Sequence, residues 1–156
     1  MSELQKISPE KIEIKEFRLV NGQVDSPYEF RSENISSFKF NVDLTAGLNI
    51  PESLIRTDIK IKVETVSKEP GSIEATGTYH FVFVYFYEGL NDVAKIEPDG
   101  KINWHPYLAN AIASITYSTS RGILLSRFQG TVMRDFMMPV VDPNNLFLPS
   151  QENMLK

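Results

Sequence analysis

A stretch without any charged side chain, residues 103–120, has the residue spacing of a single helix. Pro106 suits the first turn, where its missing N–H costs nothing, and Asn103 or His105 is a suitable N-cap. Gly122 is a suitable C-terminal stop, because glycine adopts the left-handed conformation that ends many helices. The sequence therefore predicts one long helix that ends at Gly122.

The two faces of this predicted helix indicate two different neighbours. One apolar stripe follows the 3.6-residue period and is expected to pack on the chain's own sheet: Leu108, Ala111, Ile112, Ile115 and Thr119. The second face is small and smooth, whereas a helix on the surface of a monomer normally carries charge. We expect another subunit to cover it, and burial inside one chain is the alternative. The predicted oligomer-interface residues are Ala109, Ile112, Ala113, Thr116 and Tyr117.

Composition places the chain among soluble globular proteins of one domain, with 156 residues, 42% hydrophobic and 23% charged. A net charge of −4 argues against nucleic acid as the main partner. The polar residues within the predicted helix argue against membrane insertion. The first residues contain no apolar run, so we expect no secretory signal and a cytoplasmic protein.

Catalysis and metal binding have little support in the sequence. The absence of cysteine excludes disulfides and zinc–thiolate sites, and there are only two histidines, His80 and His105. No glycine-rich phosphate loop occurs. The sequence predicts no enzyme, no metal and no cofactor.

Alternating hydrophobicity predicts four strands before the helix, over residues 11–20, 38–44, 58–64 and 76–88. The phase shifts near Lys15-Glu16, as it does at a β-bulge. Asn21-Gly22 is typical of a tight turn, residues 24–37 of a long crossover loop, and residues 46–51 of a strand break. No helix separates these strands, so the predicted fold class is α+β, with a four-stranded antiparallel sheet and one long helix.

The strand over residues 76–88 is apolar on both faces, with Phe81 and Phe83 on one side and Val82 and Val84 on the other. Such a strand is either sandwiched in the core or presents aromatic side chains to a ligand. The second interpretation supports a carrier of a small apolar ligand as one alternative function.

The segment after the helix, residues 123–141, is rich in phenylalanine and methionine and has no period. Methionine is flexible and polarizable, so such a segment suits adaptable binding. A loop packed over the core is the other interpretation.

Taken in order, these features resemble the SecB family of bacterial protein-export chaperones. The resemblance rests on an uncharged helix that ends in Ser120–Gly122, then an apolar segment, Pro139–Pro143 and Leu146–Phe147. It divides the chain into an N-terminal extension (1–10), a single domain (11–148) and a C-terminal tail (149–156). The second helix that is usual in the family is expected to be short or absent.

The resemblance implies a cytoplasmic homotetramer, a dimer of dimers with the long helices at the interface. It also implies binding of unfolded or nascent polypeptides, with the SecA motor or a toxin's antitoxin as further partners. The sequence thus predicts an ATP-independent chaperone, and an oligomeric adaptor without client binding is a second alternative. The expected client-binding residues are apolar side chains outside any periodic element: Tyr28, Phe30, Phe128, Met133, Phe136 and Met137.

Overall fold

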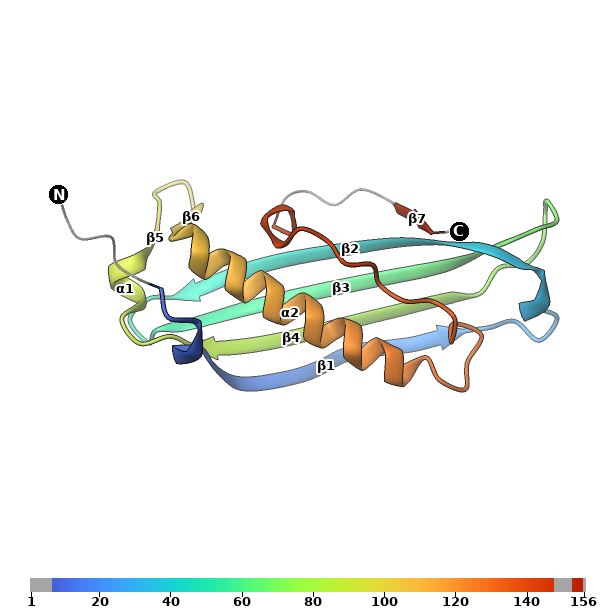
Figure 1. The fold of residues 1–156 in the computed structure, drawn as a ribbon, viewed down its shortest axis with the longest axis horizontal. Coiled ribbons are helices and arrows are strands. Elements are labelled where there is room, and N and C mark those ends of the chain that lie inside the picture. The colour runs from blue at the N-terminus through green and yellow to red at the C-terminus, as the bar shows by residue number, and fades with distance from the viewer. Residues whose placement is uncertain (1–6, 148–152, 156) are drawn as a thin grey trace.

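The computed structural model describes residues 7–147 and the backbone of residues 153–155. Its main body is a long antiparallel sheet with one helix laid diagonally across one face (Figure 1). The sheet order is β1-β4-β3-β2-β7. The bounds of these strands are β1 Glu13–Asp25, β2 Ile35–Asn49, β3 Leu54–Ser67, β4 Thr76–Phe86 and β7 Asn153–Leu155.

Strand β1 has the predicted bulge between Ile14 and Glu16, and a second one between Leu19 and Asn21. The turn predicted at Asn21-Gly22 is wrong, because β1 continues through both residues to Asp25. A Cβ atom at Gly22 would lie 2.7 Å from Cε1 of Tyr79. Glycine is therefore needed here because an aromatic ring approaches the backbone closely, and not because the chain turns.

Strands β2 and β3 form a hairpin that is longer than the sequence predicts. The break expected at residues 46–51 is wrong, because pairing continues to Asn49 opposite Leu54. The turn follows directly and includes Ser53 at a φ of 56°. The partly buried side chains of Leu48 and Ile50 pack against the core, which favours extension of the strand over an earlier turn.

The connection between β1 and β2 is the expected crossover. β1 and β2 are separated in the sheet by β4 and β3. Residues 26–34 make this connection, and Ser32–Asn34 form one turn of 3-10 helix at its end. A second short turn, Pro9–Lys11, precedes β1.

A small unit that the sequence analysis missed lies between β4 and the long helix. It consists of the single-turn helix α1 (Leu90–Val93) and a hairpin of β5 (Ala94–Ile96) and β6 (Ile102–Trp104). These strands are three residues each, too short to show a hydrophobic period.

The long helix, α2, spans Pro106–Arg127. The N–H of Tyr107 donates to Nδ1 of His105 at 3.1 Å, so the predicted histidine cap is correct. The predicted end at Gly122 is wrong. Glycine inside a helix costs about 1 kcal/mol relative to alanine. Burial of Leu124, two residues further, offsets that cost.

The sheet-facing side of α2 is rotated relative to the predicted stripe. The buried helix residues are Leu108, Ile112, Ala113, Thr116, Tyr117, Ser120 and Leu124. Thr116 sets this rotation, because its hydroxyl oxygen lies 3.1 Å from that of Thr57 and 2.7 Å from that of Tyr85. Ala111 and Ile115 therefore lie only partly buried, on the outer side.

Residues 128–147, the closing segment, run back across the sheet after α2 (Figure 1). Tyr117 donates its hydroxyl to the carbonyl of Pro139 at 2.6 Å, and the Asn110 amide donates to Asn144 at 2.8 Å. These two bonds hold the segment against the helix. The core lies between the sheet on one side and α2 with the closing segment on the other.

Candidate polypeptide-binding surface

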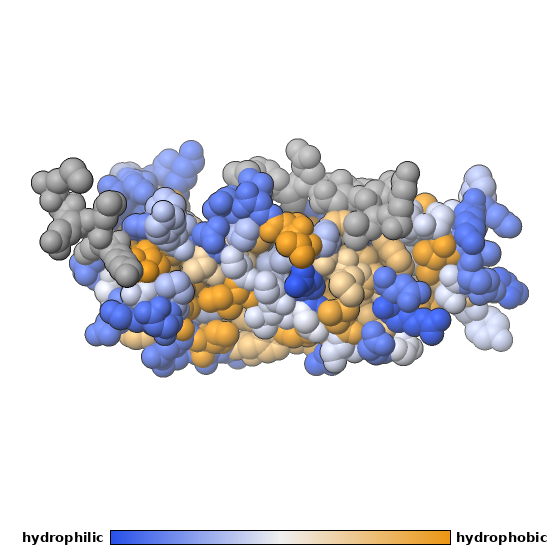
Figure 2. Space-filling model, in the orientation of Figure 1, coloured by the Kyte–Doolittle hydropathy of each residue, from blue (hydrophilic) through white to orange (hydrophobic). Residues whose placement is uncertain are grey.

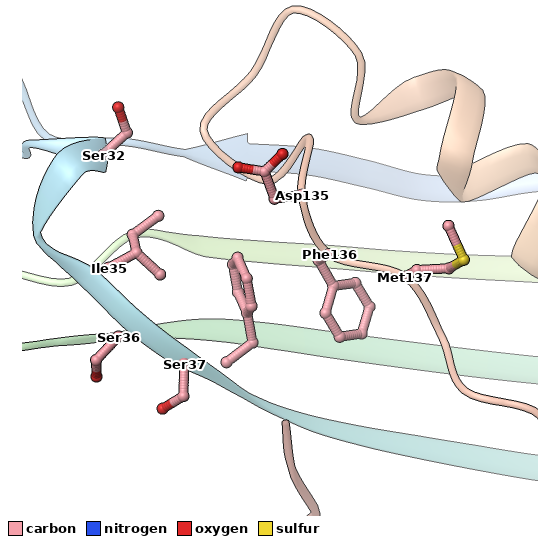
Figure 3. Close-up of a pocket in the computed structure, with 8 residues that line it drawn as sticks. Ser32, Ile35, Ser36, Ser37, Asp135, Phe136 and Met137 are labelled. Carbon is pink, nitrogen blue, oxygen red and sulfur yellow. The ribbon is translucent and has the colours of Figure 1, made fainter. Parts of the chain in front are cut away.

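A groove lies between the beginning of β2 and the closing segment (Figure 3). Its volume is about 420 Å³. One side comes from the end of the crossover and from β2, and the other from the closing segment. The lining residues are Ser32, Ile35, Ser36, Ser37, Phe38, Asp135, Phe136 and Met137.

The β2 side of the groove is held in place by β3. The N–H of Lys68 donates to the Asn34 carbonyl at 2.8 Å. The Ser36 hydroxyl donates to the Val66 carbonyl at 2.9 Å. The register also shifts between Ile35 and Ser37. Such an irregularity bends the strand, which positions this stretch as a wall beside the closing segment.

Aromatic packing forms the base of the other wall. The ring of Phe136 lies 5.5 Å from that of Phe38 and 5.6 Å from that of Phe40, measured between centroids. The N–H of Phe136 donates to the Met133 carbonyl at 2.9 Å, which closes a turn. The next residue, Met137, is 56% exposed. A buried aromatic base therefore carries a flexible apolar side chain that remains open to solvent.

The chemistry of the groove suits an extended peptide. Serine hydroxyl oxygens accept hydrogen bonds from amide N–H groups, while Phe136 and Met137 offer apolar contact. Asp135 adds one carboxylate. A mixture of this kind recognises peptide backbone and apolar side chains together.

A second surface lies on the outer side of α2 and the adjoining part of β1. Phe17 pairs with Phe83 and contacts it ring to ring at 5.1 Å, so it lies on the helix side of the sheet, yet it is exposed. Apolar and weakly polar residues run along the middle of this face, and hydrophilic residues gather at its ends (Figure 2). We call this the outer surface, and its residues are Ile14, Phe17, Ala111, Ser114, Ile115, Ser118 and Thr119.

No family model and no curated protein match the sequence. The structure, in contrast, is similar to the Mycobacterium tuberculosis SecB-like chaperone Rv1957, solved in complex with a ChAD peptide from the Rv1956 HigA1 antitoxin. The TM-score is 0.59 at 12% sequence identity, over 85% of this chain and 91% of that one. The fold is SecB-like.

This SecB-like fold confirms the predicted class, α+β with four long antiparallel strands and one main helix. At 12% identity the chains share a backbone arrangement, and most side chains differ. In the part of the chain that the structure describes, no helix is long and apolar enough to cross a membrane.

The SecB-like fold separates the expected client-binding residues into two groups. Tyr28, in the crossover, is 99% exposed, Met137 lies at the groove, and Phe30 is partly buried. Phe128, Met133 and Phe136 are buried, so for these three the loop-over-core interpretation is correct. Phe136 nevertheless lines the groove from below.

The expected oligomer-interface residues lie mostly on the inner side of α2. Ile112, Ala113, Thr116 and Tyr117 are buried within the chain, and Ala109 is partly buried. They face the chain's own sheet because of the helix rotation described above. A second copy would instead reach the outer surface.

Sequence reasoning missed the serine-rich wall and Asp135. Ser36 and Ser37 fell inside the predicted loop, and a pair of serines beside an apolar strand carries no binding signal of its own. Their place in the groove wall follows only from the meeting of β2 with the closing segment, which lie almost 100 residues apart in sequence. No local pattern reports such a contact.

The two histidines have structural partners. On the face of the sheet opposite α2, Nε2 of His80 lies 2.8 Å from Oδ2 of Asp58. Arg56 donates two further hydrogen bonds to the same carboxylate, one to each oxygen. The hydrogen bond from Arg56, with that of His80, holds the pKa of Asp58 below its usual value despite burial. His105 caps α2. Within residues 7–147, no three His, Asp or Glu side chains are placed to hold a metal ion.

Proposed function

We propose that this chain is an ATP-independent chaperone that holds non-native polypeptides in extended form. The observation that carries the proposal is the groove between β2 and the closing segment, with Met137 half exposed above a buried aromatic base. Burial of client apolar side chains supplies the driving force, at about 25 cal/mol per Å². The serine hydroxyl oxygens accept hydrogen bonds from N–H groups of the client backbone.

The SecB-like neighbour supports a peptide as the ligand class. That protein is described as a chaperone and was solved with a peptide from an antitoxin. We infer that an apolar segment of an antitoxin or of another unfolded chain is the client here. Delivery of clients to the SecA motor stays a prediction of the family resemblance.

Two assays on the purified chain test this function. The first measures aggregation of a chemically denatured model protein after dilution, with and without the chain. The second measures fluorescence anisotropy of a labelled, unstructured peptide rich in leucine and valine. We expect suppressed aggregation and saturable peptide binding, both without ATP. Failure in both assays at equimolar chain would contradict the proposal.

We also propose that the chain acts as a homo-oligomer in which a second copy covers the outer surface. The surface contains two exposed apolar side chains of β1, namely Ile14 and Phe17, beside an uncharged helix face. Contiguous apolar surface of this kind marks interaction sites. Light scattering at micromolar concentration tests it, and a particle of monomer mass would overturn this part of the proposal.

A further inference from the structure

The outer edge of β2 already carries an antiparallel strand. β7 pairs there, with Leu155 opposite Phe38, Met154 opposite Lys39 and Asn153 opposite Phe40. Without β7, β2 would be the last strand on that side of the sheet. The edge is thus competent to bind an extended segment, because its backbone donors and acceptors are in ladder geometry.

The site of this pairing adjoins the groove. β7 pairs with residues 38–40, and the groove is lined by residues 35–38 of the same strand, so both include Phe38. An extended segment paired with the β2 edge would pass directly beside the groove. Main-chain hydrogen bonds along an edge give affinity, and a pocket beside it selects side chains.

The pairing uses only a small part of the edge. β7 has three residues, whereas β2 has fifteen. Among the strands that the structure describes, only β7 pairs with β2 on this side. A longer extended segment would form more ladder hydrogen bonds with β2. β7 competes through its covalent connection, which gives it a high effective concentration at the edge.

We propose that β7 is a built-in competitor for the client: it holds the β2 edge in the client-free chain and leaves when an extended polypeptide segment pairs with that edge. This inference rests on the proposed chaperone function and adds how its site is regulated. The client strand would run antiparallel to β2, as β7 does. Occupancy of the edge by β7 lowers the apparent affinity for every client, in proportion to the fraction of chains in which the edge is open.

The experiment compares the full chain with a variant that lacks residues 153–156 and with Met154→Pro and Leu155→Pro. Amide directions alternate along a strand, so one of the two prolines removes a donor that faces β2. The double variant Met154→Leu/Leu155→Met is the matched control, since it keeps both amides and the composition. The probe is the labelled leucine- and valine-rich peptide, and the readout is its Kd by anisotropy.

We expect the deletion and one proline variant to bind the peptide about five- to tenfold more tightly than the full chain. The control should bind like the full chain. An unchanged Kd in the deletion variant would overturn the competitor role. A higher Kd in the deletion variant would overturn it as well, because β7 would then be part of the client site.

Amide hydrogen exchange separates this inference from the proposed function. In the absence of peptide, the edge-facing amides of residues 38–40 should exchange faster in the deletion variant than in the full chain, while β3 and β4 keep their protection. Adding peptide to the deletion variant should restore protection at residues 38–40. If no form of the chain binds peptide, the chaperone proposal fails. If peptide binds but leaves these amides unprotected, only the competitor inference fails.

Discussion

The phenol oxygen of Tyr85 on β4 and the side-chain oxygen of Thr116 on α2 lie 2.7 Å apart at the buried contact between sheet and helix. Thr57 on β3 completes the group, at 3.1 Å from the same threonine oxygen. All three residues are fully buried. Three hydroxyls thereby satisfy one another where water has no access, and they fix how α2 is turned over the sheet.

Replacement of Thr116 should therefore destabilise the chain more than its size suggests. Thr116→Val keeps the shape but leaves the hydroxyls of Tyr85 and Thr57 without this partner, which costs about 1–3 kcal/mol per unsatisfied group. Urea unfolding followed by circular dichroism measures the loss. Tyr85→Phe is the control, since it leaves Thr57 and Thr116 bonded and should cost less. Equal losses for the two variants would contradict this account.

Stability should fall in strongly alkaline solution. Burial raises the pKa of Tyr85 and that of Tyr117 to about 12, from an ordinary value of 10.0. Both tyrosines therefore keep their protons in the folded chain at a pH where the unfolded chain has lost them. Their contribution to the free energy of unfolding is complete below pH 10 and is lost between about pH 10 and 12.

Between about pH 10 and 12, the free energy of unfolding should fall by up to about 1.4 kcal/mol per pH unit for each buried tyrosine. Urea unfolding at pH 9, 10 and 11 measures it. Tyr85→Phe should reduce the slope, because one of the two titrating phenols is then absent. A free energy of unfolding that stays level over this range would show that neither phenol stays protonated in the folded chain.

A methyl group at Gly22 should strain the core. Gly22→Ala would place Cβ 2.7 Å from Tyr79, whose ring also packs against Phe81 and Phe128. Overpacking of this kind costs about 1–3 kcal/mol. Gly47→Ala is the matched control, since nothing lies within 4 Å of the added atom, and alanine should stabilise a strand interior by about 0.5–1 kcal/mol. Opposite signs for the two variants, measured by thermal unfolding, are the expected outcome.

A charge at Met137 should weaken client binding and spare the fold. Met137→Lys places an ammonium group at the groove, and we expect about tenfold weaker peptide binding, the effect of losing roughly 1.4 kcal/mol. Ile96→Lys is the control, because Ile96 is 51% exposed but lies in β5, away from the groove. Anisotropy gives the Kd, and urea unfolding verifies equal stability. Equal affinity in both variants would remove Met137 from the site.

A charge on the outer surface should dissociate the oligomer. Thr119→Arg places a cation in the middle of the uncharged helix face, where a second copy would have to desolvate it. Thr45→Arg makes the same replacement at an exposed position of β2 on the opposite face of the sheet. Light scattering should report a smaller particle for the first variant only. A common mass for both would place the interface elsewhere.

Features set by neighbouring residues could be predicted from the sequence. The start of α2 depends on His105 and Pro106, which are adjacent, and the first bulge of β1 appears as a shift in alternation. The two glycine errors have one cause. A glycine is a turn or stop signal only locally: Gly22 lies inside β1 where the ring of the distant Tyr79 approaches the backbone, and Gly122 lies inside α2, which continues and buries Leu124 against the core.

The candidate site was predictable only in part, for a related reason. The sequence of the closing segment has no hydrophobic period, so it does not show which side chains reach the core. Met133 and Phe136 are buried and Met137 is exposed, although the three are near neighbours. The rotation of α2 depends on Thr57 and Tyr85, both far from Thr116 in sequence, so helical spacing alone predicted the wrong face.

The position of β1 has a consequence for synthesis of the protein. β1 pairs only with β4 among the described strands, so Glu13 meets Phe86 and Asp25 meets Thr76. While the ribosome is still translating the hairpin of β2 and β3, the first strand has no neighbour to join. A nascent copy of this chain therefore passes through a stage in which β1, with its apolar residues Ile14, Phe17 and Leu19, has no partner strand, and slow translation of β4 would prolong that stage.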